Sequence, residues 1–77
     1  MRKTVEQMMI DLIAVISERM HALGLTAEEL ADRADIEETT MLNLLALREP
    51  LEVEQLVRIG NALGERAGDL AKAGEER

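Results

Sequence analysis

The sequence predicts an all-α protein, a compact bundle of four to five helices in which the first helix is long. Apolar residues recur every three or four positions, which is the spacing of one helix face. No segment alternates polar and apolar residues as a half-buried strand does. Threonines precede two of the apolar stretches and single glycines follow two of them, as expected at helix starts and helix ends. A chain of 77 residues corresponds to one small domain.

The first helix is predicted over residues 4 to 23. The pattern Thr4-x-x-Gln7 is a capping box, in which two side chains satisfy free backbone amides at the helix start. Gly24 follows the helix and favours the left-handed conformation that ends many helices. The predicted core-facing stripe consists of Val5, Met8, Met9, Leu12, Ile13, Ile16, Met20 and Leu23.

Two apolar residues of this helix, Ile10 and Val15, lie off the main stripe. They widen the apolar surface beyond what one small core requires. Because a small domain without disulfides gains stability from association, self-association is favoured. Ile10, Val15 and one methionine of the Met8–Met9 pair are therefore candidates for a dimer seam, and a homodimer is the expected assembly.

The second helix is predicted from Ala27 to Ala34, after a second capping box, Thr26-x-x-Glu29. Asp35 then occupies a turn that often requires a positive φ, which aspartate tolerates better than most residues. The third helix is predicted from Glu38 to Ala46. Its start is weakly capped, since Glu37 is a poor N-cap residue.

Pro50 interrupts the helical pattern, so residues 48–50 are predicted to form a loop. The fourth helix is predicted from Val53 to Leu63 and ends at Gly64. Its expected apolar side carries Val53, Leu56, Val57, Ile59, Gly60 and Leu63. A short fifth helix is predicted over residues 67 to 73 and is expected to dock through Leu70.

These elements form one predicted domain, residues 4–73, while residues 1–3 and 74–77 are expected to fray. One contiguous core is expected to join the second, third and fourth helices. Its predicted members are Leu30, Ala34, Ile36, Met41, Leu44, Leu56, Ile59 and Leu63.

The composition excludes several kinds of site. The chain has no aromatic residue, so it lacks the platform on which single-stranded nucleic acids stack. It has no cysteine, so disulfides and thiolate metal sites are excluded. No apolar run approaches the ~20 residues of a membrane span. We therefore expect no membrane association, and we expect a cytoplasmic location.

The polar residues give no indication of catalysis. His21 is the only histidine and is expected on the solvent side of the first helix. Ser17 has no histidine at a helical neighbour position that would activate it. The paired carboxylates are expected to be solvated or to interact with helix dipoles; they are Glu28–Glu29, Glu37–Glu38 and Glu75–Glu76. We expect no enzymatic activity, no cofactor, no metal site and no small-molecule substrate.

Three segments together carry a family resemblance: Gly24-Leu25-Thr26-Ala27-Glu28-Glu29-Leu30-Ala31, Ala34-x-Ile36, and Leu56-x-x-Ile59-x-x-Ala62-Leu63-Gly64. In sequence and spacing they resemble the Cro and lambda-repressor type of helix-turn-helix over about residues 10 to 72. The resemblance implies four or five short helices. It also implies an operator-binding dimer whose third helix enters the major groove.

The chain departs from this family where the family contacts DNA. Ala27 stands where members commonly carry a phosphate-binding glutamine, and Leu47 stands where a glycine often follows the third helix. Small polar or basic residues are usual at positions that here hold Glu37, Glu38, Leu42, Asn43, Leu45 and Ala46. The net charge is −7 and the basic residues are scattered, which disfavours binding to phosphates.

Three functional hypotheses follow from these departures. The first is a regulator in transcription control whose third helix binds a protein, either a partner regulator or a second copy. Its expected contact residues are Glu37, Glu38, Met41, Leu42, Leu45 and Leu47. In the alternative, a dimeric repressor binds DNA through Thr39, Thr40, Asn43 and Arg48, with Arg33 and Arg58 near phosphates. A third hypothesis, an acidic inhibitor that mimics DNA, rests on the net charge alone.

The three leucines at positions 42, 45 and 47 leave one structural question open. They contact a partner in the first hypothesis, but they join the core if the third helix is rotated relative to the family. Consecutive residues lie about 100° apart on a helix, so the run Met41-Leu42-x-Leu44-Leu45 cannot face one side. Part of this apolar surface is therefore expected to be exposed, as protein-contact surfaces often are.

Overall fold

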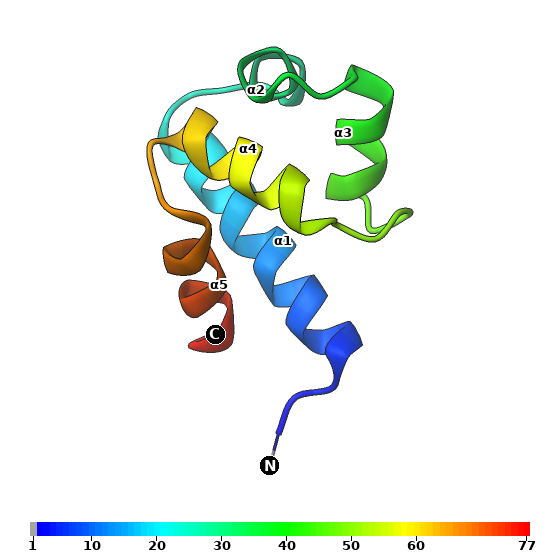
Figure 1. The fold of residues 1–77 in the computed structure, drawn as a ribbon, viewed down its shortest axis with the longest axis vertical. Coiled ribbons are helices and arrows are strands. Elements are labelled where there is room, and N and C mark those ends of the chain that lie inside the picture. Colours follow the sequence, from blue (N-terminus) through cyan, green and yellow to red (C-terminus); the bar gives the residue numbers. More distant parts are fainter. Residues whose placement is uncertain (1) are drawn as a thin grey trace.

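The computed structural model describes residues 2–77, in which the chain forms five helices and no strand (Figure 1). The helices are α1 (Val5–Ala22), α2 (Ala27–Ala34), α3 (Glu38–Leu45), α4 (Val53–Leu63) and α5 (Ala67–Glu75). The prediction of an all-α bundle with a long first helix is confirmed. The predicted ranges of α2 and α4 agree with the structure, α3 is one residue shorter than predicted, and α5 is two residues longer.

The predicted helix starts and stops are present as specific hydrogen bonds and dihedral angles. Thr26 Oγ1 accepts from the backbone N–H of Glu29 at 3.1 Å, and the Glu29 carboxylate accepts from the backbone N–H of Thr26 at 3.0 Å. Gly24, Asp35 and Gly64 all adopt a positive φ. The first capping box is only half formed. Thr4 Oγ1 accepts from the backbone N–H of Gln7, but the side chain of Gln7 donates to Asp11 and does not accept from the backbone N–H of Thr4.

The helices divide into two packed groups that share one core. Helices α2 and α3 form the helix-turn-helix and α4 packs across α2, while α5 lies along α1 (Figure 1). The fully buried side chains come from all five helices: Ile16, Leu30, Met41, Leu44, Ile59 and Leu70. Of the other predicted core residues, Ala34 and Leu63 are buried, whereas Ile36 and Leu56 are partly buried against the cluster.

The position of α5 corrects the prediction for Val15. Because α5 covers a second side of α1, Val15 is only 4% exposed and belongs to the core, so it cannot contribute to a dimer seam. Conversely, five residues on the predicted core-facing stripes are exposed, among them Met8 and Val57 at 43% each, and three of the five are more than half exposed. They are Val5, Leu23 and Val53, with exposed fractions of 80%, 55% and 78%.

The two ends of the described chain are held against the bundle by polar contacts. The ammonium group of Lys3 donates to the carbonyl oxygens of Gly74 and Glu75 and forms a 2.8 Å ion pair with Asp11. Arg77 pairs with Glu18 of α1. This differs from the expectation of fraying at residues 74–77. Helix α5 continues through Gly74, whose backbone lies directly against the backbone of Leu12.

Candidate functional site

The turn between α2 and α3 sets the orientation of the third helix. Asp35 adopts the left-handed conformation, with φ of 55° and ψ of 47°. Arg58 of α4 donates to the carbonyl oxygen of Asp35 at 2.9 Å and to the Glu54 carboxylate at 2.7 Å. The backbone N–H of Ile36 also donates to the carbonyl oxygen of Ala31. Arg58 therefore stabilises the turn. Its guanidinium group is already bonded to the Asp35 carbonyl oxygen and the Glu54 carboxylate.

Helix α3 separates its apolar residues between the core and the surface. Met41 and Leu44 are fully buried, and Leu45 is partly buried against the same core. Leu42 is 49% exposed, about 100° around the helix from Met41. Met41 was predicted both in the core and among the contact residues. Its burial agrees with the first prediction and contradicts the second, since a fully buried side chain cannot meet a partner. The alternative that these leucines join the core through a rotated third helix is therefore correct in part for Leu45 and incorrect for Leu42.

The start of α3 is exposed and acidic. Glu37 is its N-cap residue but makes no side-chain capping hydrogen bond, and Glu38 lies in the first turn. Both glutamates and the neighbouring Thr39 are exposed. Both carboxylates are thus free to face a binding partner.

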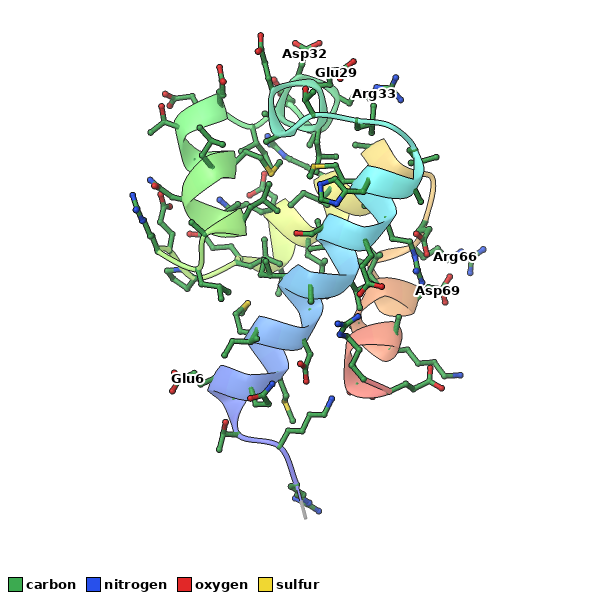
Figure 2. All side chains as sticks on the ribbon, turned by 180° about the vertical axis from the view of Figure 1, so that it is seen from behind. Glu6, Glu29, Asp32, Arg33, Arg66 and Asp69 are labelled. Carbon is green, nitrogen blue, oxygen red and sulfur yellow. The ribbon has the colours of Figure 1, made fainter. Side chains whose placement is uncertain are left out.

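A hollow of about 500 Å³ lies between α2 and the start of α3. Four carboxylates line it, from Glu28, Glu29, Asp32 and Glu38, together with Ala31 and Ile36. Figure 2 shows the side chains of Glu29 and Asp32 extending from α2 away from the body of the protein. The backbone N–H of Thr26 donates to Glu29 and lowers the pKa of that carboxyl below its usual value. Glu29 is therefore negatively charged at neutral pH.

The three α2 carboxylates were missed as site residues by the sequence analysis. Glu28 and Glu29 were expected only to be solvated or to interact with the helix dipole. The available signal was the i, i+4 spacing of Glu28 and Asp32 on the exposed face of α2, which the turn at Asp35 places beside the start of α3.

The candidate DNA-contacting residues do not form one cluster. Thr39 is exposed, but Thr40 is half-buried in a second hollow of about 270 Å³ whose lining includes Glu37, Glu52 and Glu54. Asn43 donates its side-chain amide to Glu49 at 2.9 Å. Arg48 is exposed, but it lines a groove shared with the start of α1. In the described chain, these four residues therefore offer few free hydrogen-bond donors on one face.

A family model for the Cro/C1-type helix-turn-helix DNA-binding domain matches residues 15–75. The chain belongs to this family. No curated protein and no solved structure gives a significant match. The resemblance inferred from the sequence is confirmed, and membership of the Cro/C1 type places the chain among transcription regulators.

The matched range includes every helix of the helix-turn-helix and its covering helix α4. This Cro/C1-type domain thus has the family scaffold, with carboxylates on the surface between α2 and α3. Among the described residues no helix is long and apolar enough to cross a membrane. Nor does any group of three His, Cys, Asp or Glu side chains in residues 2–77 come close enough together to hold a metal ion.

Proposed function

We propose that this Cro/C1-type domain acts in transcription control by binding a protein through the exposed face of α3, and that it does not read DNA on its own. The observation that carries this proposal is the row of four carboxylates in the hollow between α2 and α3. Phosphate neutralisation by Lys and Arg supplies most non-specific DNA affinity, and carboxylates at the same place oppose it.

The apolar residues beside the carboxylates indicate the chemistry of the partner. Leu42 is half-exposed, and Glu37 and Glu38 lie at the start of the same helix. Burying Leu42 against an apolar partner surface gains free energy, whereas burying it in a polar DNA groove gains little. A partner with an apolar patch bordered by Lys or Arg would complement both features.

The first test is direct binding to DNA. Random and genomic duplexes should bind weakly and without saturation at ~50 mM salt, where electrostatic attraction to DNA is strong. Tight, saturable binding to either duplex under these conditions would refute the proposal.

The second test compares partner capture by matched variants. Leu42→Lys places a like charge opposite a basic partner and should abolish capture of a specific protein from lysate of the source cells. Val53→Lys changes an equally apolar, exposed residue on α4 and should leave that capture unchanged. Equal capture by both variants would show that α3 is not the contact surface.

A second candidate function is operator binding as a dimer, which the family description favours. In that case Thr39, Thr40, Asn43 and Arg48 make the DNA contacts. The double substitution Asn43→Ala and Arg48→Ala should then abolish a gel shift with the operator. An unchanged shift would reject these residues as the contacts.

A further inference from the structure

Helix α5 packs along one face of α1 (Figure 1). Gly74, near the end of α5, lies against the backbone of Leu12, whereas Glu65, just before α5, pairs with Arg19 about two turns further along α1. The two helices therefore run in opposite directions. The residues of α1 on this face recur at the three- and four-residue spacing of one helix side. They are Asp11, Leu12, Val15, Glu18 and Arg19.

The apolar contact between these two helices is small. Helix α5 carries one large apolar side chain, Leu70, which is fully buried. Its other apolar residues are Ala67, Ala71 and Ala73. On the α1 side, Val15 is buried and Leu12 is partly buried against the core. Hydrophobic stabilisation grows with the apolar area removed from water, and alanines contribute little area. Apolar packing alone therefore attaches α5 less firmly than the other helices.

Polar contacts supplement this small apolar contact. Three of the five ion pairs in residues 2–77 lie here, and they are Lys3–Asp11, Arg19–Glu65 and Arg77–Glu18. The ammonium group of Lys3 also donates to the carbonyl oxygens of Gly74 and Glu75, at 3.0 and 3.1 Å. The side chains of these three ion pairs are 13–55% exposed. Charge pairs that reach the surface in this way are weakened by salt.

The sequence of α5 also gives it little helix stability of its own. The helix has nine residues, and two of them, Gly68 and Gly74, are glycines, which disfavour a helix. Its N-cap residue, Arg66, makes no side-chain capping hydrogen bond. Isolated helices shorter than about 12–15 residues are marginal in water even with better sequences. The helical structure of α5 therefore depends on its contact with α1.

We propose that α5 is a releasable cover of α1 whose attachment depends on ionic strength. It leaves α1 as a unit while α2, α3 and α4 stay folded, and its release exposes Val15 and the apolar face around it. Proteins open in such cooperative units, and the unit with the fewest apolar contacts opens first. Salt weakens the ion pairs of α5 but leaves the buried side chains of the helix-turn-helix packed. The proposal does not depend on the protein-binding role of α3.

A single introduced thiol can report this release, because the chain has no cysteine. Val15→Cys places the thiol under α5, and Ala34→Cys places it at a buried position of α2. Uncharged iodoacetamide alkylates each thiol only when its site opens, and mass spectrometry gives the rate. The Val15→Cys thiol should react at least about tenfold faster, because α5 opens without global unfolding. Equal rates would mean that the whole domain opens together, which overturns the proposal.

Two further substitutions separate the release of α5 from global unfolding. Lys3→Met removes the contacts of the ammonium group and should raise the reaction rate of the Val15→Cys thiol about tenfold. Asp35→Val strains the helix-turn-helix, so it should raise the rate of the Ala34→Cys thiol and leave that of the Val15→Cys thiol unchanged. The control Arg33→Met removes a positive charge from the exposed face of α2 and should leave the Val15→Cys rate unchanged. The proposal fails if Asp35→Val accelerates both thiols equally, or if Lys3→Met accelerates neither.

Salt tests whether charge holds α5 in place. The screening length falls from about 30 Å at 0.01 M to about 3 Å at 1 M salt. Across this range the rate of the Val15→Cys thiol should rise about threefold or more, and it should rise less when Lys3→Met is also present. A rate that does not change with salt overturns the ionic attachment. Circular dichroism checks that each variant folds. Amide hydrogen exchange on the native chain gives the same comparison without a cysteine, and α5 should exchange faster than α2, α3 and α4.

Discussion

At the residue scale, the helix-turn-helix depends on the backbone of Asp35. Its φ of 55° lies in the left-handed region, and its carbonyl oxygen accepts a hydrogen bond from Arg58. The Asp35 side chain is fully exposed. What this position contributes is therefore a backbone conformation and not a packed side chain.

The effect of a substitution at Asp35 on the free energy of unfolding should depend on how well the new residue tolerates a positive φ. Asp35→Val should lower the free energy of unfolding by about 1–2 kcal/mol, because a β-branched residue is strained at positive φ. Asp35→Gly should leave it unchanged or raise it by up to about 1 kcal/mol. Urea denaturation measures both. Asp32→Val, on the exposed face of α2, is the control and should cost only about 0.5 kcal/mol. Equal losses for the two valine variants would contradict this account.

Individual residues were predicted from sequence where the signal was local. The positive φ of Asp35 followed from its position between two helical patterns. Met41 was predicted both in the core and on the contact surface, and Leu42 was left open between the two, because both residues are apolar and the rotation of α3 decides which one faces the core. Arg58 was expected near phosphates, and its contact with Asp35 joins residues 23 positions apart, which no local pattern encodes.

At the element scale, two helical glycines differ in what surrounds them. A Cβ atom at Gly60, within α4, would lie 2.7 Å from the carbonyl oxygen of Glu65 and 3.3 Å from the backbone nitrogen of Ala67. At Gly68, within α5, a Cβ atom would meet nothing within 4 Å. Gly60 therefore permits the close approach of the α4–α5 connection, whereas Gly68 has no such role.

Alanine substitutions should have opposite effects at these two positions. Gly68→Ala should raise the free energy of unfolding by up to about 1 kcal/mol, because alanine favours helix over glycine. Gly60→Ala should lower it by about 1–3 kcal/mol, because the new methyl group overlaps backbone atoms that cannot move away independently. Thermal or urea unfolding measures both variants. A stabilising Gly60→Ala would show that the connection adjusts freely.

Helix boundaries were largely predicted from the capping residues, since these act within a few positions of the chain. The end of α5 was the main exception. The fifth helix was predicted to end at residue 73, but α5 continues through Gly74, whose lack of a side chain permits contact with the Leu12 backbone. Likewise, the burial of Val15 depends on α5, which lies more than 50 residues later in the sequence.

At the scale of the whole molecule, Lys3 joins the start of the chain to the end of α5. Its three ammonium hydrogens match three acceptors, on Gly74, Glu75 and Asp11. The hydrogen bond from Lys3 keeps the pKa of Asp11 below its usual value, although desolvation of the carboxyl acts in the opposite direction. Folding therefore favours the charged form of Asp11.

This ion pair should give a pH dependence of stability with a defined sign. The lowered pKa means that the contribution of Asp11 is fully present above about pH 4, the unfolded value, and is lost as the pH falls through the lower folded value. Urea denaturation from neutral pH to pH 2 should show this loss in the native chain. Asp11→Asn and Lys3→Met should both reduce it, and an unchanged pH dependence in both variants would exclude the pair as its source.

The placement of charge, more than its total, should decide whether this Cro/C1-type domain binds DNA. Reversing Glu28, Asp32 and Glu38 to lysine leaves the capping residue Glu29 intact. If the hollow faces DNA as the family scaffold implies, the variant should gain duplex affinity by about a hundredfold or more at ~50 mM salt, with a slope near −0.9 per phosphate neutralised. The same three reversals at Asp69, Glu75 and Glu76, at and beyond α5, change the net charge equally. This α5 variant should gain far less duplex affinity than the variant of the hollow. Equal gains in affinity would mean that the net charge alone prevents DNA binding.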